Sequence, residues 1–137
     1  RRVEKETIQG LVGRTRTVVA TGGGAVLDEG NRRVLQALGL VVYLQTTPEA
    51  LAARVGRSGD RPLLSGEDPV AVLAALLKAR EQYYSEADEV ITTDGRTPAQ
   101  VGAEIIRLAQ RWGLDTTPPD GRRQEEDELD DGQTDRN

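Results

Sequence analysis

The chain of 137 residues contains no cysteine, no histidine, no methionine and no phenylalanine. Without cysteine it can form neither a disulfide framework nor a thiolate metal site. Without histidine it lacks the usual general base and the commonest metal ligand. No apolar run approaches the roughly 18 residues that a transmembrane helix needs, and no signal peptide is recognisable. We therefore expect a soluble, cytoplasmic, single-domain protein, and the missing methionine indicates a fragment or a processed form.

Charge is distributed unevenly along the chain. Residues 115–137 hold nine acids and three arginines, a net charge of −6, whereas the whole chain carries −5. The body is thus nearly neutral, and with so few aromatics it favours neither nucleic-acid binding nor a membrane. Its basic residues are mostly arginine, which suits a bidentate grip on phosphate or carboxylate but also follows from a GC-rich genome.

Helical and strand patterns alternate along the body. Asp28 is a candidate N-cap, and Thr47-Pro48 and Thr97-Pro98 each combine an N-cap with a first-turn proline. We expect helices at about 3–11, 28–38, 47–55, 69–85 and 97–112, and strands at 17–20, 40–44 and 89–92. Strands separated by helices predict an α/β fold with a parallel sheet and right-handed crossovers.

Two segments have the composition of irregular structure. Residues 56–68 are polar and contain glycine, and a loop of that length is often a functional lid. Residues 113–137 are rich in proline, glycine and charge, with almost no apolar side chain, which predicts a disordered acidic tail. The expected organisation is one domain at 1–112, with its lid at about 56–68, followed by the tail.

Three consecutive glycines, Gly22, Gly23 and Gly24, follow the apolar segment at 17–20. Glycine lets the backbone turn sharply and lets a ligand approach it closely. In open α/β sheets, ligands bind at the carboxyl ends of the strands. No Gly-Lys-Ser/Thr follows, so the segment is not a P-loop. It is either a tight turn or a backbone platform for a polar small molecule.

Two arginines are candidates for anion binding. Arg80 falls on the apolar stripe of its predicted helix, together with Leu73, Leu77 and Tyr84. An inward guanidinium needs either an acidic partner, a route to solvent or an anionic ligand. Arg61 precedes a stiff Pro-Leu-Leu segment in the predicted lid. It is either solvated or able to stabilise charge on a transferring phosphoryl group.

Taken together, these residues resemble those of a known enzyme family. Five features share its order and spacing: Arg1 with Glu4, Ala-Thr-Gly-Gly-Gly at 20–24, an apolar strand ending at 43–44, Arg-Pro-Leu-Leu at 61–64, and Arg80 with Tyr84. From residue 1 to about 108, the chain is similar to the C-terminal two thirds of a shikimate kinase. That family transfers the γ-phosphoryl group of ATP to the 3-hydroxyl of shikimate, with magnesium, in aromatic amino-acid biosynthesis.

The resemblance implies roles in binding the acid. Arg1 and Arg80 resemble the two arginines that bind the shikimate carboxylate. Gly22, Gly23 and Gly24 resemble the platform for its hydroxyls, with Gly23 the most direct match. An anion at this place would account for an arginine on an otherwise apolar helix face.

The resemblance also implies a nucleotide site. Arg61 resembles the lid arginine that reaches the ATP phosphates and steadies the transition state, which makes it the expected catalytic residue. Arg54 and Arg96 resemble residues near the adenine end of ATP. No residue of this chain matches a metal ligand. The Mg²⁺ ligand of the family belongs to a segment that would precede Arg1.

The chain departs from the family in lacking the Walker A loop with its lysine and hydroxyl. The acid that contacts the shikimate hydroxyls would also lie upstream. The family's P-loop-kinase-like sheet has the order 2-3-1-4-5, of which this chain would hold strands 3, 4 and 5. We therefore expect an incomplete sheet, an inactive and weakly stable or molten chain, and stabilisation by the N-terminal segment. The intact parent would be a monomer.

Two alternatives remain open from the sequence. The first is a related small-molecule kinase such as a gluconate kinase. The second is a non-catalytic, kinase-like interaction module whose acidic tail recruits a partner. Two arginines suited to a carboxylate, beside three glycines, favour shikimate over gluconate.

Overall fold

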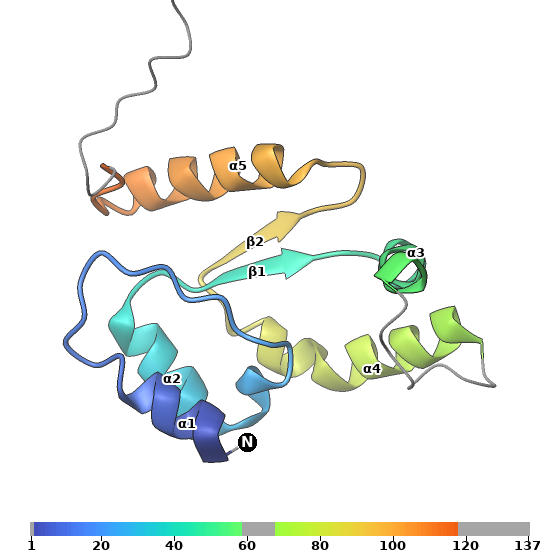
Figure 1. The fold of residues 1–137 in the computed structure, drawn as a ribbon, viewed down its shortest axis with the longest axis horizontal. Helices are drawn as coiled ribbons and strands as arrows, with labels where there is room; N and C mark the ends of the chain where they lie inside the picture. Colours follow the sequence, from blue (N-terminus) through green and yellow to red (C-terminus); the bar gives the residue numbers. More distant parts are fainter. Residues whose placement is uncertain (1, 59–67, 118–137) are drawn as a thin grey trace, which may run out of the picture.

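The computed structural model describes residues 2–58 and 68–117. A two-stranded sheet lies at its centre, with one helix along one side, one beyond the ends of the strands and the remaining helices on the other side (Figure 1). The elements are, in chain order, α1 (Arg2–Gln9), the 3₁₀ helix η1 (Ala25–Leu27), α2 (Glu29–Leu38), β1 (Val42–Gln45), α3 (Pro48–Ser58), α4 (Pro69–Tyr84), β2 (Glu89–Thr92) and α5 (Pro98–Arg111).

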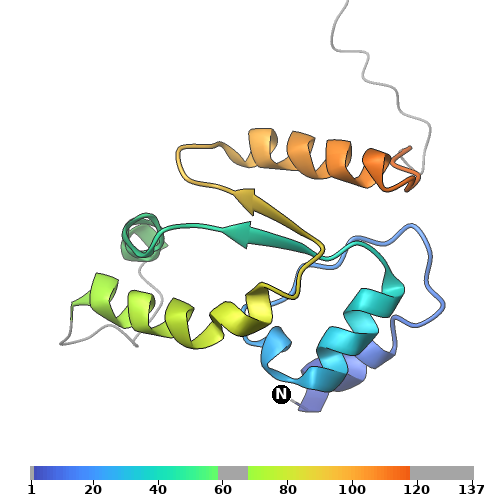
Figure 2. The ribbon, with the colours of Figure 1, turned by 180° about the vertical axis from the view of Figure 1, so that it is seen from behind.

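The two strands pair in parallel, as the alternation of helices and strands predicted. The register places Val42 opposite Glu89 and Gln45 opposite Thr92. Helices α3 and α4 make the crossover between the strands, and α5 then returns over the sheet (Figure 2). The α/β class, the parallel sheet and the flanking helices are thus confirmed.

The predicted strand at 17–20 is wrong for this structure. These residues take no regular structure, and 95% of the Val18 side chain is exposed. A β-strand forms backbone hydrogen bonds with a neighbouring strand, and no described strand lies alongside this segment. Its β-branched residues carry the propensity for a strand without a partner to pair with.

Helix starts follow the predicted capping residues. The Asp28 carboxylate accepts from the backbone N–H of Asn31 at 3.0 Å, at the start of α2. Thr97 and Gln100 form a reciprocal capping box at the start of α5. Both helices begin where the sequence placed them.

The predicted lid is corrected at its first residues. Helix α3 continues to Ser58, so residues 56–58 are helical instead of belonging to a loop. The rest of the predicted lid up to residue 67, including Arg61, lies outside the described residues, as does the tail from residue 118.

The main apolar cluster lies between α5 and the sheet. Ile91, Val101 and Leu108 are buried there, and Leu40, Val42 and Ile105 pack against them. Trp112 continues the helical spacing of Val101, Ile105 and Leu108, but 48% of it is exposed. Its indole N–H donates to the Glu89 carboxylate at 3.0 Å, so a polar contact at the surface holds the ring.

Little apolar surface is buried for a chain of this length. Six apolar residues are buried within the described ranges, whereas Leu44 and Val90, both on the sheet, are 46% and 51% exposed. We therefore expect the isolated chain to be folded only in the cold, to lose its far-ultraviolet circular dichroism gradually on warming, and to bind a hydrophobic dye as it does so. A sharp unfolding transition at high temperature would contradict this expectation.

Candidate functional site

The glycine segment, residues 22–24, lies against the C-terminal half of α4. The Tyr84 hydroxyl donates to the backbone carbonyl of Gly23 at 3.0 Å. A Cβ built on Gly23 would lie 3.0 Å from the Tyr84 oxygen and 3.5 Å from a guanidinium nitrogen of Arg80. The approach to Arg80 is an ordinary contact, whereas a Cβ at residue 23 would be tight against Tyr84, so glycine favours this close approach of the backbone to the Tyr84 hydroxyl. The structure thus brings two predicted site elements, Gly23 and Arg80, to the same place.

A pair of stacked tyrosines holds the side chain that contacts Gly23. The rings of Tyr43, on β1, and Tyr84, on α4, stack with centroids 4.6 Å apart and planes 11° from parallel. Burial raises the pKa of the Tyr43 hydroxyl above its usual range, and the nearby Tyr84 and Glu81 raise it further. The stack holds the Tyr84 hydroxyl beside the backbone carbonyl of Gly23. From the sequence, Tyr84 was assigned to the apolar stripe and, with Arg80, to the features shared with the family, but its contacts with Tyr43 and Gly23 were not predicted.

Arg80 is half-buried on α4, and Leu73 of the same stripe is buried. Within residues 2–58 and 68–117, no carboxylate lies within ion-pair distance of its guanidinium, and no hydrogen bond to it is formed. The first of the sequence's three alternatives, an acidic partner, is therefore not found in the described part of the chain. A partly desolvated cation beside bare backbone is suited to receive an anion.

Helix α1 approaches the glycine segment from the other side. A Cβ on Gly22 would lie 3.9 Å from a carboxylate oxygen of Glu4. The helix is held there by Lys5, whose ammonium lies 3.2 Å from the Asp28 carboxylate. The backbone N–H of Asn31 and the Lys5 ammonium both hold the pKa of Asp28 below its usual range. Arg1, predicted to share the acid with Arg80, lies outside the described residues.

A hollow of about 170 Å³ lies between α1 and the start of α2. Its lining comprises Glu4, Gly24, Leu27, Asp28 and Asn31. A larger depression, about 490 Å³, borders Leu108 and the charged residues of α5. We place the site at the glycine segment because the second depression has none of the predicted anion-binding residues around it.

The predicted nucleotide-binding arginines lie at the carboxyl ends of the strands. The Arg54 guanidinium donates to the carbonyl and hydroxyl oxygens of Thr93, just past β2, at 3.2 and 3.3 Å. Arg96 pairs instead with Glu104 on α5 at 2.9 Å. The turn between Thr93 and Arg96 thus connects both side chains to the end of β2. Arg61 is outside the described ranges, so the structure does not test its role.

The described residues offer no site of their own for a divalent cation. In the described ranges, no three acidic side chains gather closely enough to hold a metal ion. Hard cations such as Mg²⁺ need several oxygen ligands. A membrane helix is likewise not found, because each described helix is too short or too polar to cross a bilayer.

Comparison with known proteins shows which family this chain resembles. The profile described as shikimate kinase matches residues 1–110. The shikimate kinase of Xanthomonas campestris pv. campestris (strain 8004) is 39% identical over 120 residues, which cover 86% of this chain and 67% of that protein. The shikimate kinase of Moorella thermoacetica is 44% identical over 112 residues, 82% of this chain and 64% of that protein.

Solved structures of shikimate kinases also resemble this chain. A shikimate kinase from Acinetobacter baumannii in complex with shikimate superposes with a TM-score of 0.71 at 35% identity, covering 82% of this chain and 63% of that one. A shikimate kinase from Bacteroides thetaiotaomicron shares the fold, with a TM-score of 0.68 at 23% identity. The chain spans about two thirds of the length of these relatives. On the match of its first 110 residues, it belongs to the shikimate kinase family.

Proposed function

We propose that this chain forms the acid-binding part of a kinase that transfers the γ-phosphoryl group of ATP to the 3-hydroxyl of shikimate. The observation that carries the proposal is Arg80, a half-buried guanidinium without an acidic partner in the described residues, beside the bare backbone of Gly23. Membership of a family that uses ATP with Mg²⁺ supports it. So does the related Acinetobacter baumannii structure, which contains shikimate.

In this proposal, two arginines hold the carboxylate of the acid. Arg80 supplies one guanidinium from α4, and Arg1 supplies the other. A planar guanidinium can make two parallel hydrogen bonds to a carboxylate, which fixes the orientation of the acid as well as its position. The backbone of Gly22, Gly23 and Gly24 then faces the hydroxyls. A site built to hydrogen-bond hydroxyl groups discriminates strongly against analogues that lack them.

The remaining arginines are assigned to the nucleotide. Arg61 is assigned to the ATP phosphates, where its charge would stabilise negative charge as the phosphoryl group moves. Arg54 and Arg96 lie near the adenine. In the transfer, the oxygen of the 3-hydroxyl bonds to the γ-phosphorus, the bond to the β-phosphate oxygen breaks, and the hydroxyl proton is released with ADP. Positioning and charge stabilisation account for most of the catalysis in such transfers.

Titration with shikimate tests the acid-binding part of this proposal. We expect saturable shifts of the backbone amide resonances of Gly22, Gly23 and Gly24 at 4 °C. Gluconate at equal concentration should cause smaller shifts, because its flexible chain loses more conformational freedom on binding. The Arg80→Met variant should lose the response, and Arg33→Met is the matched control because Arg33 is 77% exposed and pairs with Glu29.

Two outcomes would count against the proposal. Equal or stronger binding of gluconate would favour a related sugar-acid kinase. No saturable response to either acid would favour a non-catalytic interaction module.

A further inference from the structure

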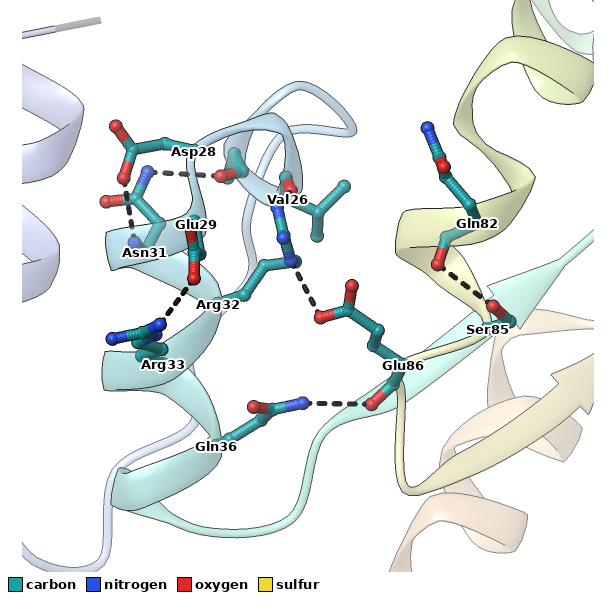
Figure 3. Close-up of polar contacts among 11 residues, drawn as sticks. Val26, Asp28, Glu29, Asn31, Arg32, Arg33, Gln36, Gln82, Ser85 and Glu86 are labelled. Atoms are coloured by element: carbon teal, nitrogen blue, oxygen red, sulfur yellow. Dashed lines mark hydrogen bonds and ion pairs between the residues drawn. The ribbon is translucent and has the colours of Figure 1, made fainter.

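No role was predicted for Arg32, which lies on α2. Its side chain is only 14% exposed. Its Nε donates to the Glu86 carboxylate at 2.7 Å, and its Nη1 donates to the backbone carbonyl of Val26 at 2.8 Å. The guanidinium carbon also lies 4.8 Å from the centre of the Tyr83 ring. One guanidinium thus contacts Val26, Glu86 and Tyr83, and Figure 3 shows Arg32 between Val26 and Glu86.

These contacts connect the two halves of the candidate acid site. Val26 is two residues beyond Gly24, in η1, and therefore belongs to the turn that ends the glycine segment. Tyr83 and Glu86 flank Tyr84 at the C-terminal end of α4, the helix that carries Arg80. The direct contact between the halves is the hydrogen bond from Tyr84 to Gly23, which is itself part of the site. Arg32 makes the second connection from outside it.

A second residue of α2 reinforces the connection. Gln36 lies one helical turn after Arg32, and its amide donates to the backbone carbonyl of Glu86 at 3.1 Å. Residues at this spacing share one face of a helix. Arg33, in contrast, extends from the other side of α2 and pairs with Glu29 (Figure 3). Adjacent arginines thus have different surroundings, one enclosed between segments and one in solvent.

The contacts of the Arg32 guanidinium are of a kind that fixes the position of one segment relative to another. A partly buried ion pair adds little net stability, because desolvation offsets much of the attraction. A planar guanidinium with several directed donors, however, constrains the angle and the separation of the groups that it joins. An aliphatic side chain of the same size could fill the space without fixing either. The contact therefore bears mainly on the relative placement of η1 and α4.

We propose that Arg32 is a positioning residue for acid binding: through Val26 and Glu86 it sets the separation between the glycine segment and Arg80. This inference rests on the proposed function, because the separation matters only if a carboxylic acid binds between the glycine segment and Arg80. Without Arg32, Arg80 would sample a wider range of positions relative to the backbone of Gly23. Binding would then weaken although every group that touches the acid is still present.

A distance measurement tests the positioning role separately from ligand binding. The chain has no cysteine, so Ala20→Cys and Ala79→Cys, both at exposed positions, give the only two sites for nitroxide labels. Double electron–electron resonance on samples frozen from 4 °C should give a narrow distance distribution in the parent. We expect Arg32→Met and Glu86→Gln to broaden it, Arg32→Lys to broaden it less, and Arg33→Met to leave it unchanged. Glu86→Gln preserves the size of the side chain and removes only its charge. Broadening in this variant can therefore be assigned to loss of the ion pair and not to unfolding.

The same variants are then titrated with shikimate. Arg32→Met should weaken binding by about tenfold, equivalent to about 1.4 kcal/mol, whereas Arg33→Met should bind like the parent. Unchanged distance distributions in both Arg32→Met and Glu86→Gln would overturn the positioning role, as would broadening without any loss of affinity. If the parent itself binds no shikimate, the proposed function is wrong, and the distance distributions still decide whether Arg32 holds the two segments together.

Discussion

Incubated with ATP, Mg²⁺ and shikimate, the 137-residue chain should release no ADP above a blank without protein. Phosphoryl transfer depends on groups that cradle the phosphates and neutralise their charge. No Gly-x-x-x-x-Gly-Lys-Ser/Thr motif occurs in this sequence, and no described cluster of acids can hold a metal ion. Loss of a single electrostatic donor typically lowers a rate by about 10²–10³-fold. Loss of an entire phosphate cradle should therefore leave no measurable turnover. A coupled assay of ADP release measures it.

Supplying the cradle should restore activity. A chimera that places a P-loop-bearing segment of a related shikimate kinase ahead of residue 1 should turn over shikimate. Arg80→Met in that chimera should raise the KM for shikimate far more than the KM for ATP, because Arg80 is assigned to the acid. Arg33→Met in the same chimera should leave both unchanged. ADP release by the unmodified chain that requires both substrates and scales with its concentration would show that the cradle is dispensable.

Local signals in the sequence predicted most of the elements correctly. Asp28 and Thr97 start α2 and α5 because an N-cap side chain acts on the backbone two or three residues away. Strand β2 was predicted at its observed residues because its apolar run is bounded by charged and turn residues. Such elements depend on neighbours in sequence, so the sequence alone is sufficient to place them.

Elements that depend on distant neighbours were predicted less well. The segment at 17–20 has strand composition, but a strand exists only where another strand completes its ladder, and composition does not reveal that. The end of α3 was placed too early because Gly56, a frequent helix terminator, is accommodated inside the helix. Both errors arise where tertiary context overrides local preference.

The candidate site divides in the same way. Helical spacing predicted the stripe that carries Arg80, and the three consecutive glycines can be read directly from the sequence. The stack of Tyr43 on Tyr84 joins residues 41 positions apart, and the Arg32–Glu86 pair joins residues 54 positions apart. No periodicity connects such residues. The only signal in the sequence was the spacing of Arg32 and Gln36, which places both side chains on one face of a helix. That spacing does not indicate that the face contacts Glu86.

Replacing Gly23 by valine should abolish detectable binding of shikimate. A Cβ there would lie 3.0 Å from the Tyr84 hydroxyl oxygen, closer than nearly all real contacts of this kind, and the two methyl groups of valine add further volume. Tyr84 is held by its stack on Tyr43, so it cannot withdraw freely. Overpacking of this sort typically costs about 1–3 kcal/mol. A cost in the upper part of this range, if it falls on the bound state, corresponds to binding weakened by about a hundredfold.

Gly102→Val is the matched control for this substitution. Gly102 lies on α5, and a Cβ built there meets nothing within 4 Å, so valine should be accommodated and affinity should stay at the parent value. Near-ultraviolet circular dichroism of the tyrosines reports whether the stack survives in each variant. If Gly23→Val keeps both the stack and the parent affinity for shikimate, the backbone at residue 23 does not face the acid. The anion that Arg80 binds would then have to lie on another side of α4.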